Sequence, residues 1–71
     1  MKASVKKELL AIAVSVARHK ATTERLREEE EYYACDLEDE DKQEASEALQ
    51  EALGELADLL DAVDAAIADM L

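Results

Sequence analysis

Residues 49–70 read LQEALGELADLLDAVDAAIADM, a stretch rich in leucine, alanine and carboxylates and free of proline. Its large apolar residues recur at intervals of four and three, the spacing that places them on one face of an α-helix. The carboxylates fall on the opposite side, because a helix turns by about 100° per residue. The apolar row comprises Leu49, Leu53, Leu56, Leu60, Val63, Ile67 and Met70. We therefore expect a long amphipathic helix over about residues 40–70.

A second row with the same spacing lies in the N-terminal part of the chain. Its members are Val5, Leu9, Ile12, Val16, His19, Thr23, Leu26, Glu30 and Tyr33, and a neighbouring row comprises Leu10, Val14, Ala17 and Ala21. Together the rows predict a helix over about residues 3–34, with an apolar arc wider than one partner helix covers. We interpret His19 as a polar member of the row that fixes register, because no second ligand lies at metal-binding spacing from it.

Residues 34–40 interrupt this periodicity with a cluster of carboxylates and predict an acidic turn at about 35–39. Asp41 and Glu44 have the spacing of a capping box, in which the first carboxylate accepts a backbone amide at the start of a helix. One continuous helix is the alternative, because no glycine or proline enforces the turn. The turn is favoured because the first apolar row does not meet the second without a shift.

The charge is divided unevenly along the chain. Residues 1–27 carry seven basic and two acidic side chains, a net of +5, whereas residues 28–71 carry one lysine and seventeen acidic side chains, a net of −16. Opposite charges favour an antiparallel hairpin, in which residues 5–21 lie beside about 53–70. This pairing brings Lys2, Lys6, Lys7 and Arg18 close to Asp58, Asp61, Asp64 and Asp69.

The expected fold is therefore all-α, a single domain over residues 1–71 that forms an antiparallel two-helix hairpin. Two helices alone cannot cover apolar surfaces this wide, and chains this small often gain stability by association. We expect a homodimeric four-helix bundle, with capture of a different protein as the alternative. The residues expected in the core or the dimer interface are Val5, Leu9, Leu10, Ile12, Val14, Val16, Leu49, Leu53, Leu56, Leu60, Val63, Ile67 and Met70.

The composition argues against several classes of protein. A net charge of −11 disfavours binding to the nucleic-acid backbone, and no apolar run approaches the roughly 18 residues of a membrane span. The single cysteine, Cys35, cannot form an intrachain disulfide, which favours a reduced thiol or, alternatively, a disulfide between two copies. Residues 1–17 have the outline of a secretory signal, but Glu8 and the helical periodicity favour a helix. We expect a cytoplasmic protein without a cofactor.

Two acidic pairs, Glu28-x-x-Glu31 and Glu55-x-x-Asp58, lie within the expected helices. Together with the stretch EALGELAD at residues 51–58, they resemble the acidic motifs of MazG-like nucleotide pyrophosphohydrolases, which are all-helical enzymes. The resemblance implies that Glu28, Glu31, Glu55 and Asp58 hold magnesium. Eight acid-x-x-acid pairs occur in this chain, so the motif has low specificity for a metal site. We therefore favour a protein without a metal or catalytic site.

The architecture also resembles that of Rop-type plasmid regulatory hairpins, which form antiparallel four-helix dimers. That resemblance implies RNA binding through the first helix, where Arg18, Lys20, Arg25 and Arg27 form a thin basic strip. It is architectural only and carries no correspondence between residues.

The sequence contains no glycine-rich phosphate loop, nucleophile elbow or Cys/His cluster. We interpret the chain as a non-enzymatic acidic helical protein, of the kind that phages and plasmids encode, which homodimerises and binds another protein. A basic partner is expected, and the acidic surface would imitate the charge of a nucleic acid. The residues expected to contact that partner are Tyr32, Tyr33, Glu47, Glu51, Glu55 and Asp58.

Overall fold

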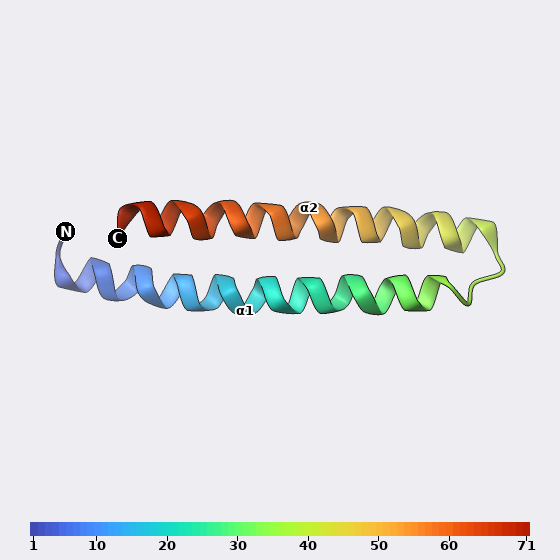
Figure 1. The fold of residues 1–71 in the computed structure, drawn as a ribbon, viewed down its shortest axis with the longest axis horizontal. Helices are drawn as coiled ribbons and strands as arrows, with labels where there is room; N and C mark the ends of the chain where they lie inside the picture. Colours follow the sequence, from blue (N-terminus) through green and yellow to red (C-terminus); the bar gives the residue numbers. More distant parts are fainter.

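The computed structural model describes residues 1–71 and consists of two long helices, α1 (Ala3–Ala34) and α2 (Glu40–Met70). The helices run antiparallel and pack along their length, as Figure 1 shows. Their bounds agree with the helices predicted from the apolar rows, and the alternative of one continuous helix is wrong. The chain contains no strand.

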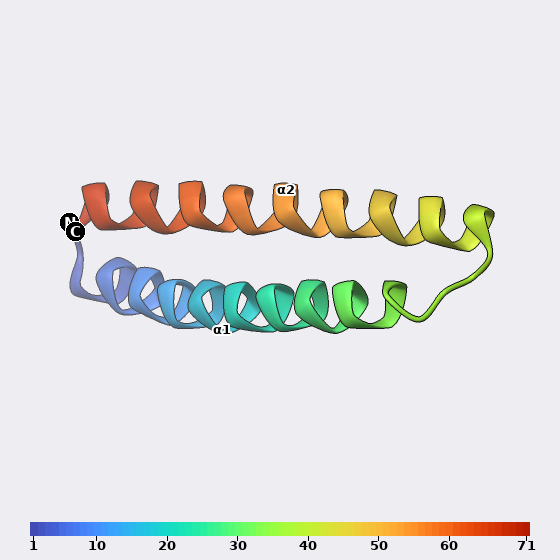
Figure 2. The same cartoon turned by 45° about the vertical axis from the view of Figure 1, so that its right-hand side comes forward.

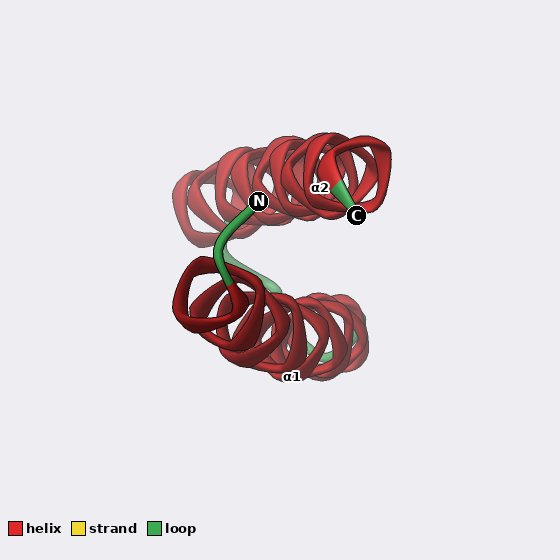
Figure 3. Ribbon diagram, turned by 90° about the vertical axis from the view of Figure 1, so that its left-hand side faces the viewer, coloured by secondary structure: helices red, strands yellow, loops and turns green.

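The hairpin is elongated, with extents of 56 × 14 × 11 Å between Cα atoms. Both termini lie at one end of the molecule and the turn lies at the other (Figures 1 and 2). Viewed along its length, the two helices cross at a shallow angle (Figure 3). We call the end that holds the termini the open end and the other the turn end.

The turn is formed by backbone hydrogen bonds at the C-terminal end of α1 and by an aspartate that caps the N-terminal end of α2. The amides of Asp36 and Leu37 donate to the carbonyls of Tyr33 and Ala34, each at 3.2 Å. Asp39 has an extended backbone, and its carboxylate accepts from the amides of Asp41 at 2.9 Å and Lys42 at 3.4 Å. Such a cap satisfies amides that have no partner within the helix.

The capping box predicted at Asp41 and Glu44 is therefore wrong by two residues. Helix α2 begins at Glu40, so the residue in the capping position is Asp39, and Asp41 already lies in the first turn. Glu40 and Asp41 still contribute, because negative charge in the first turn interacts favourably with the positive end of the helix dipole.

Each helix turns a stripe of less exposed side chains toward the other, which we call the interhelical seam. In α1 it comprises Leu9, Ala13, Val16, Lys20, Thr23, Glu30 and Ala34, and in α2 Gln43, Ser46, Gln50, Leu53, Ala57, Leu60 and Ile67. Both stripes alternate steps of three and four residues, as expected for helices packed side by side.

The seam coincides with the predicted apolar rows at only every second position. Leu9, Val16, Thr23 and Glu30 of α1 and Leu53, Leu60 and Ile67 of α2 belong to both. The intervening members are exposed, and small or polar residues such as Ala13, Lys20 and Ala57 lie in the seam instead. Each helix is thus rotated so that half of its apolar row faces sideways, away from its partner within the hairpin.

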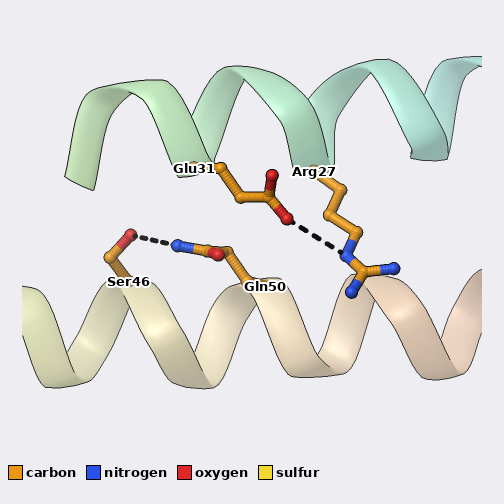
Figure 4. A network of polar contacts seen from close by, with 4 residues as sticks. All are labelled: Arg27, Glu31, Ser46 and Gln50. Atoms are coloured by element: carbon orange, nitrogen blue, oxygen red, sulfur yellow. Dashed lines mark hydrogen bonds and ion pairs between the residues drawn. The ribbon is translucent and has the colours of Figure 1, made fainter. Parts of the chain in front are cut away.

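The seam changes character along the hairpin. At the open end it is apolar, and Val16 and Ile67 are the two buried apolar residues of the chain, at 8% and 4% exposure. Toward the turn it becomes polar. Buried Ser46 donates to the Glu30 carboxylate at 2.8 Å. It also accepts from the Gln50 amide at 3.3 Å, as Figure 4 shows. Buried Thr23 donates to the carbonyl of His19 at 2.7 Å.

We expect Asp39→Ala to lower the free energy of unfolding by about 1 kcal/mol, because two backbone amides of α2 lose their acceptor. The measurement is urea denaturation followed by circular dichroism at one fixed protein concentration. Asp36→Ala is the matched control, because it removes the same charge from the turn but no capping hydrogen bond. An equal loss in both variants would show that charge, and not the cap, determines the effect.

Candidate interaction surfaces

Most large apolar side chains of this hairpin are exposed. The eight that continue the predicted rows outside the seam range from 42% to 56% exposure; they are Val5, Ile12, Leu26, Tyr33, Leu49, Leu56, Val63 and Met70. Only two apolar side chains are buried in the hairpin. The chain therefore has a very small core for its length when it is taken alone.

These exposed residues fall into two rows with a strict seven-residue spacing. In α1 the row is Val5, Ile12, His19, Leu26 and Tyr33, and in α2 it is Leu49, Leu56, Val63 and Met70. Within its own helix, each row lies roughly 80° to one side of the middle of the seam. A spacing of seven residues keeps every member on one side along the whole helix.

The two rows lie on the same broad side of the hairpin. Both helices have the same seam pattern and run antiparallel, so a local two-fold axis perpendicular to the helices relates them. Equivalent rows of the two helices therefore face the same way. We call the surface formed by the two rows the apolar face, and it contains His19 in addition to the eight exposed apolar residues above.

The opposite broad side is dominated by carboxylates and is called here the acidic face. It comprises Glu24, Glu28, Glu31, Glu47, Glu51, Asp58 and Asp61. Two contacts mark this side: the Lys20 ammonium pairs with Asp61, and the Arg27 guanidinium lies over Gly54. Arg27 also approaches Glu31 within α1, at 3.7 Å between Nε and Oε1 (Figure 4).

Lys20 and Asp61 form the ion pair that joins the two helices. The hydrogen bond and the charge of Asp61 raise the pKa of Lys20 above its usual value of 10.5. The predicted proximity of basic α1 and acidic α2 is thus realised at Lys20. Lys2, Lys6, Lys7 and Arg18 form no ion pair with the aspartates of α2.

Gly54 is half-buried on α2, beneath the Arg27 side chain. A Cβ at this position would lie 3.5 Å from the guanidinium carbon, an ordinary contact distance. Packing against α1 therefore does not require glycine at this position.

The residues predicted to contact a partner are divided between surfaces. Glu47, Glu51 and Asp58 lie on the acidic face, whereas Glu55 lies on the back of α2, away from α1. Tyr33 belongs to the apolar face, and Tyr32, at 79% exposure, lies on the back of α1. The adjacent tyrosines thus point in different directions, because consecutive residues of a helix are separated by about 100°.

Leu10 and Val14, which were assigned with the interface residues from the sequence, are exposed. They lie on the other side of α1 from Val5 and Ile12, on the broad side that carries the acidic face and near the open end. One partner seated on the apolar face would leave both of them uncovered.

The four carboxylates of the MazG-like motifs do not converge. No group of three or more His, Cys, Asp or Glu side chains is placed to hold a metal ion. Glu31 instead approaches Arg27, and Glu55 lies on a different side of α2 from Asp58. The surface has no pocket, and the thiol of Cys35 is free and exposed in the turn.

The thin basic strip considered for RNA binding is also divided. Lys20 is paired with Asp61, and Arg27 is placed between Gly54 and Glu31. Arg18 and Arg25 lie on the back of α1 and share their row with Tyr32.

Comparison with protein-family models, with curated proteins and with solved structures finds no match to this chain. Neither helix combines the length and the apolar character that crossing a membrane requires.

We expect Asp61→Asn to lower the free energy of unfolding at neutral pH, because it removes the acceptor of Lys20. The raised pKa means that the folded state favours the charged lysine. The contribution of the pair is therefore complete below pH 10.5 and is lost as the pH rises through the higher pKa of the folded chain. The difference between wild type and variant should shrink over that range in urea denaturation. Asp69→Asn removes the same charge without an ion pair, and its effect should not follow this profile.

Proposed function

We propose that this protein is a non-enzymatic interaction module that homodimerises through its apolar face and binds a basic protein surface through its acidic face. The observation that carries the proposal is the separation of the two surfaces: two heptad rows of exposed apolar side chains on one broad side and a field of carboxylates on the other.

The apolar face supports association because it is too large and too continuous for an isolated small protein. Exposed apolar patches of several hundred Å² generally mark interaction sites. The broad side of the hairpin measures 56 × 14 Å between Cα atoms, and a stable complex takes about 800 Å² from each partner. One side of the hairpin therefore has the size of a dimer interface.

The rotation of the helices supports the same proposal. In a four-helix bundle each helix contacts two neighbours, one within its hairpin and one across the dimer. The seam uses one half of each predicted row, such as Val16 and Leu60, for the first contact. The other half, such as Ile12 and Val63, is left for the second contact.

The acidic face supports a basic partner. Its seven carboxylates are accompanied by Lys20 and Arg27 at the margin, which are both already paired, and by Lys7 near the open end, in the heptad row of Val14 and Glu28. Surfaces of one sign steer partners of the opposite sign and suppress association with others. We propose a partner surface of the kind that binds nucleic acid, whose phosphate charges the carboxylates would imitate.

We expect Val63→Lys to convert the dimer to a monomer of 7.8 kDa in sedimentation equilibrium. Each dimer would bury two unpaired ammonium groups in its apolar interface, which should raise the dissociation constant at least about 100-fold. Ala62→Lys is the matched control, because this neighbouring residue is exposed on the back of α2. A wild-type mass of 7.8 kDa at micromolar concentration would contradict dimerisation.

The acidic face is tested by affinity capture from the native host, followed by titration of the captured protein. We expect a basic protein whose binding weakens steeply with added salt, and which loses affinity for the triple variant Glu47→Gln, Glu51→Gln and Asp58→Asn. The control variant Glu38→Gln, Glu55→Gln and Asp69→Asn has the same net charge but leaves the acidic face intact. Equal binding to both variants would contradict a role for this face.

A further inference from the structure

We propose that the second copy docks on the apolar face in the opposite direction, so that the two turns lie at opposite ends of the bundle and α2 packs against α2 of the partner. This inference rests on the proposed dimerisation and adds the arrangement of the two hairpins. Two observations carry it: the unequal flanks of the apolar face and the concentration of negative charge at one end of the hairpin.

A two-fold axis allows two ways to join the apolar faces. If the axis runs along the helices, both turns lie at the same end and each α1 packs against α2 of the partner. If the axis is perpendicular to the helices and lies in the interface, the turns lie at opposite ends. Each helix then packs against its own equivalent in the other copy.

The residues that flank the apolar face determine which helices of the two copies pack favourably against each other. Outside the exposed rows, α2 presents the uncharged heptad row Ala45, Ala52, Leu59 and Ala66, whereas α1 presents Glu8, Ser15, Thr22 and Glu29. Pairing α1 with α2 would press carboxylates against an alanine surface that offers no hydrogen bond, which is costly. Pairing α2 with α2 instead joins two small apolar flanks, and α1 with α1 joins two polar flanks.

The charge at the turn end favours the same arrangement. Residues 28–44 contain ten carboxylates and one lysine, a net of −9. With both turns at one end of the bundle, two such segments would lie side by side and repel each other. With the turns at opposite ends, each acidic segment lies next to the open end of the other copy, where five basic side chains precede residue 21.

The two halves of α1 have opposite net charge, although the charged members of its flank row are Glu8 and Glu29 alone. Residues 1–20 have a net charge of +4, and residues 24–34 have a net charge of −3. Antiparallel pairing places the positive half of one helix beside the negative half of the other. Such complementarity fixes the direction of docking more than it adds affinity.

The test uses Cys35, the only cysteine, which is exposed in the turn and accepts a nitroxide label without substitution. Pulsed electron paramagnetic resonance on the labelled wild-type dimer should give a distance close to the 56 Å length of the hairpin. Turns at the same end would instead give roughly 10–25 Å, because neighbouring helices lie 8–10 Å apart.

A control label at Ala62→Cys in a Cys35→Ser background lies on the back of α2, in the half of that helix nearer the open end. In either arrangement it should give a distance below about 40 Å, because the helices of a bundle lie within about two interaxial spacings, and so it reports the dimer itself. A short Cys35 distance together with the control signal would overturn the docking direction and leave dimerisation intact. A mass of 7.8 kDa for the labelled chain, with no dipolar signal at either position, would overturn both.

Discussion

Two helices packed side by side can bury only one narrow stripe of each, and this constraint governs the surface of the molecule. The apolar residues of α1 and α2 extend over a wider arc than such a stripe. The hairpin resolves the excess by rotating both helices in the same sense, so that one half of each apolar row is covered and the other half lies together on one broad side. The carboxylates are displaced to the opposite side by the same rotation.

At the turn end, the polar residues of the seam stabilise the hairpin less than apolar residues would. Two of the four buried residues are polar, Thr23 and Ser46, and their hydroxyl groups are satisfied by a backbone carbonyl and by the Glu30 carboxylate. Satisfied hydroxyl groups contribute less to stability than close-packed leucines would, but the Ser46 hydroxyl reaches the Glu30 carboxylate of the other helix in only one register. The hydrogen bond between Ser46 and Glu30 and the ion pair between Lys20 and Asp61 join the two helices and define their stagger, while Val16 and Ile67 provide the apolar burial.

The helices and their antiparallel order follow from the sequence, because spacing and charge both indicate them without reference to side-chain conformation. The seam does not follow, since periodicity identifies an apolar arc but not the part of the arc that a neighbour covers. Ile12 and Ala13 differ by one position, and only the packed structure places Ala13 inside. Similarly, Asp39 and Asp41 are both suitable caps, and the extended backbone at Asp39 decides between them. The acidic face could be predicted in part: Glu47, Glu51 and Asp58 lie on it, but Glu55 does not.

The gradient along the seam also has a kinetic consequence. Contacts near the turn join residues that are close in sequence, yet these are the polar contacts, and the apolar ones join distant parts of the chain. Val16 and Ile67 are separated by about 50 positions, so the largest gain in burial arrives only after a long loop has closed. The contacts nearest the turn therefore contribute little of the apolar burial that stabilises the hairpin. We therefore expect both helices to be largely formed and aligned over most of their length in the transition state for folding.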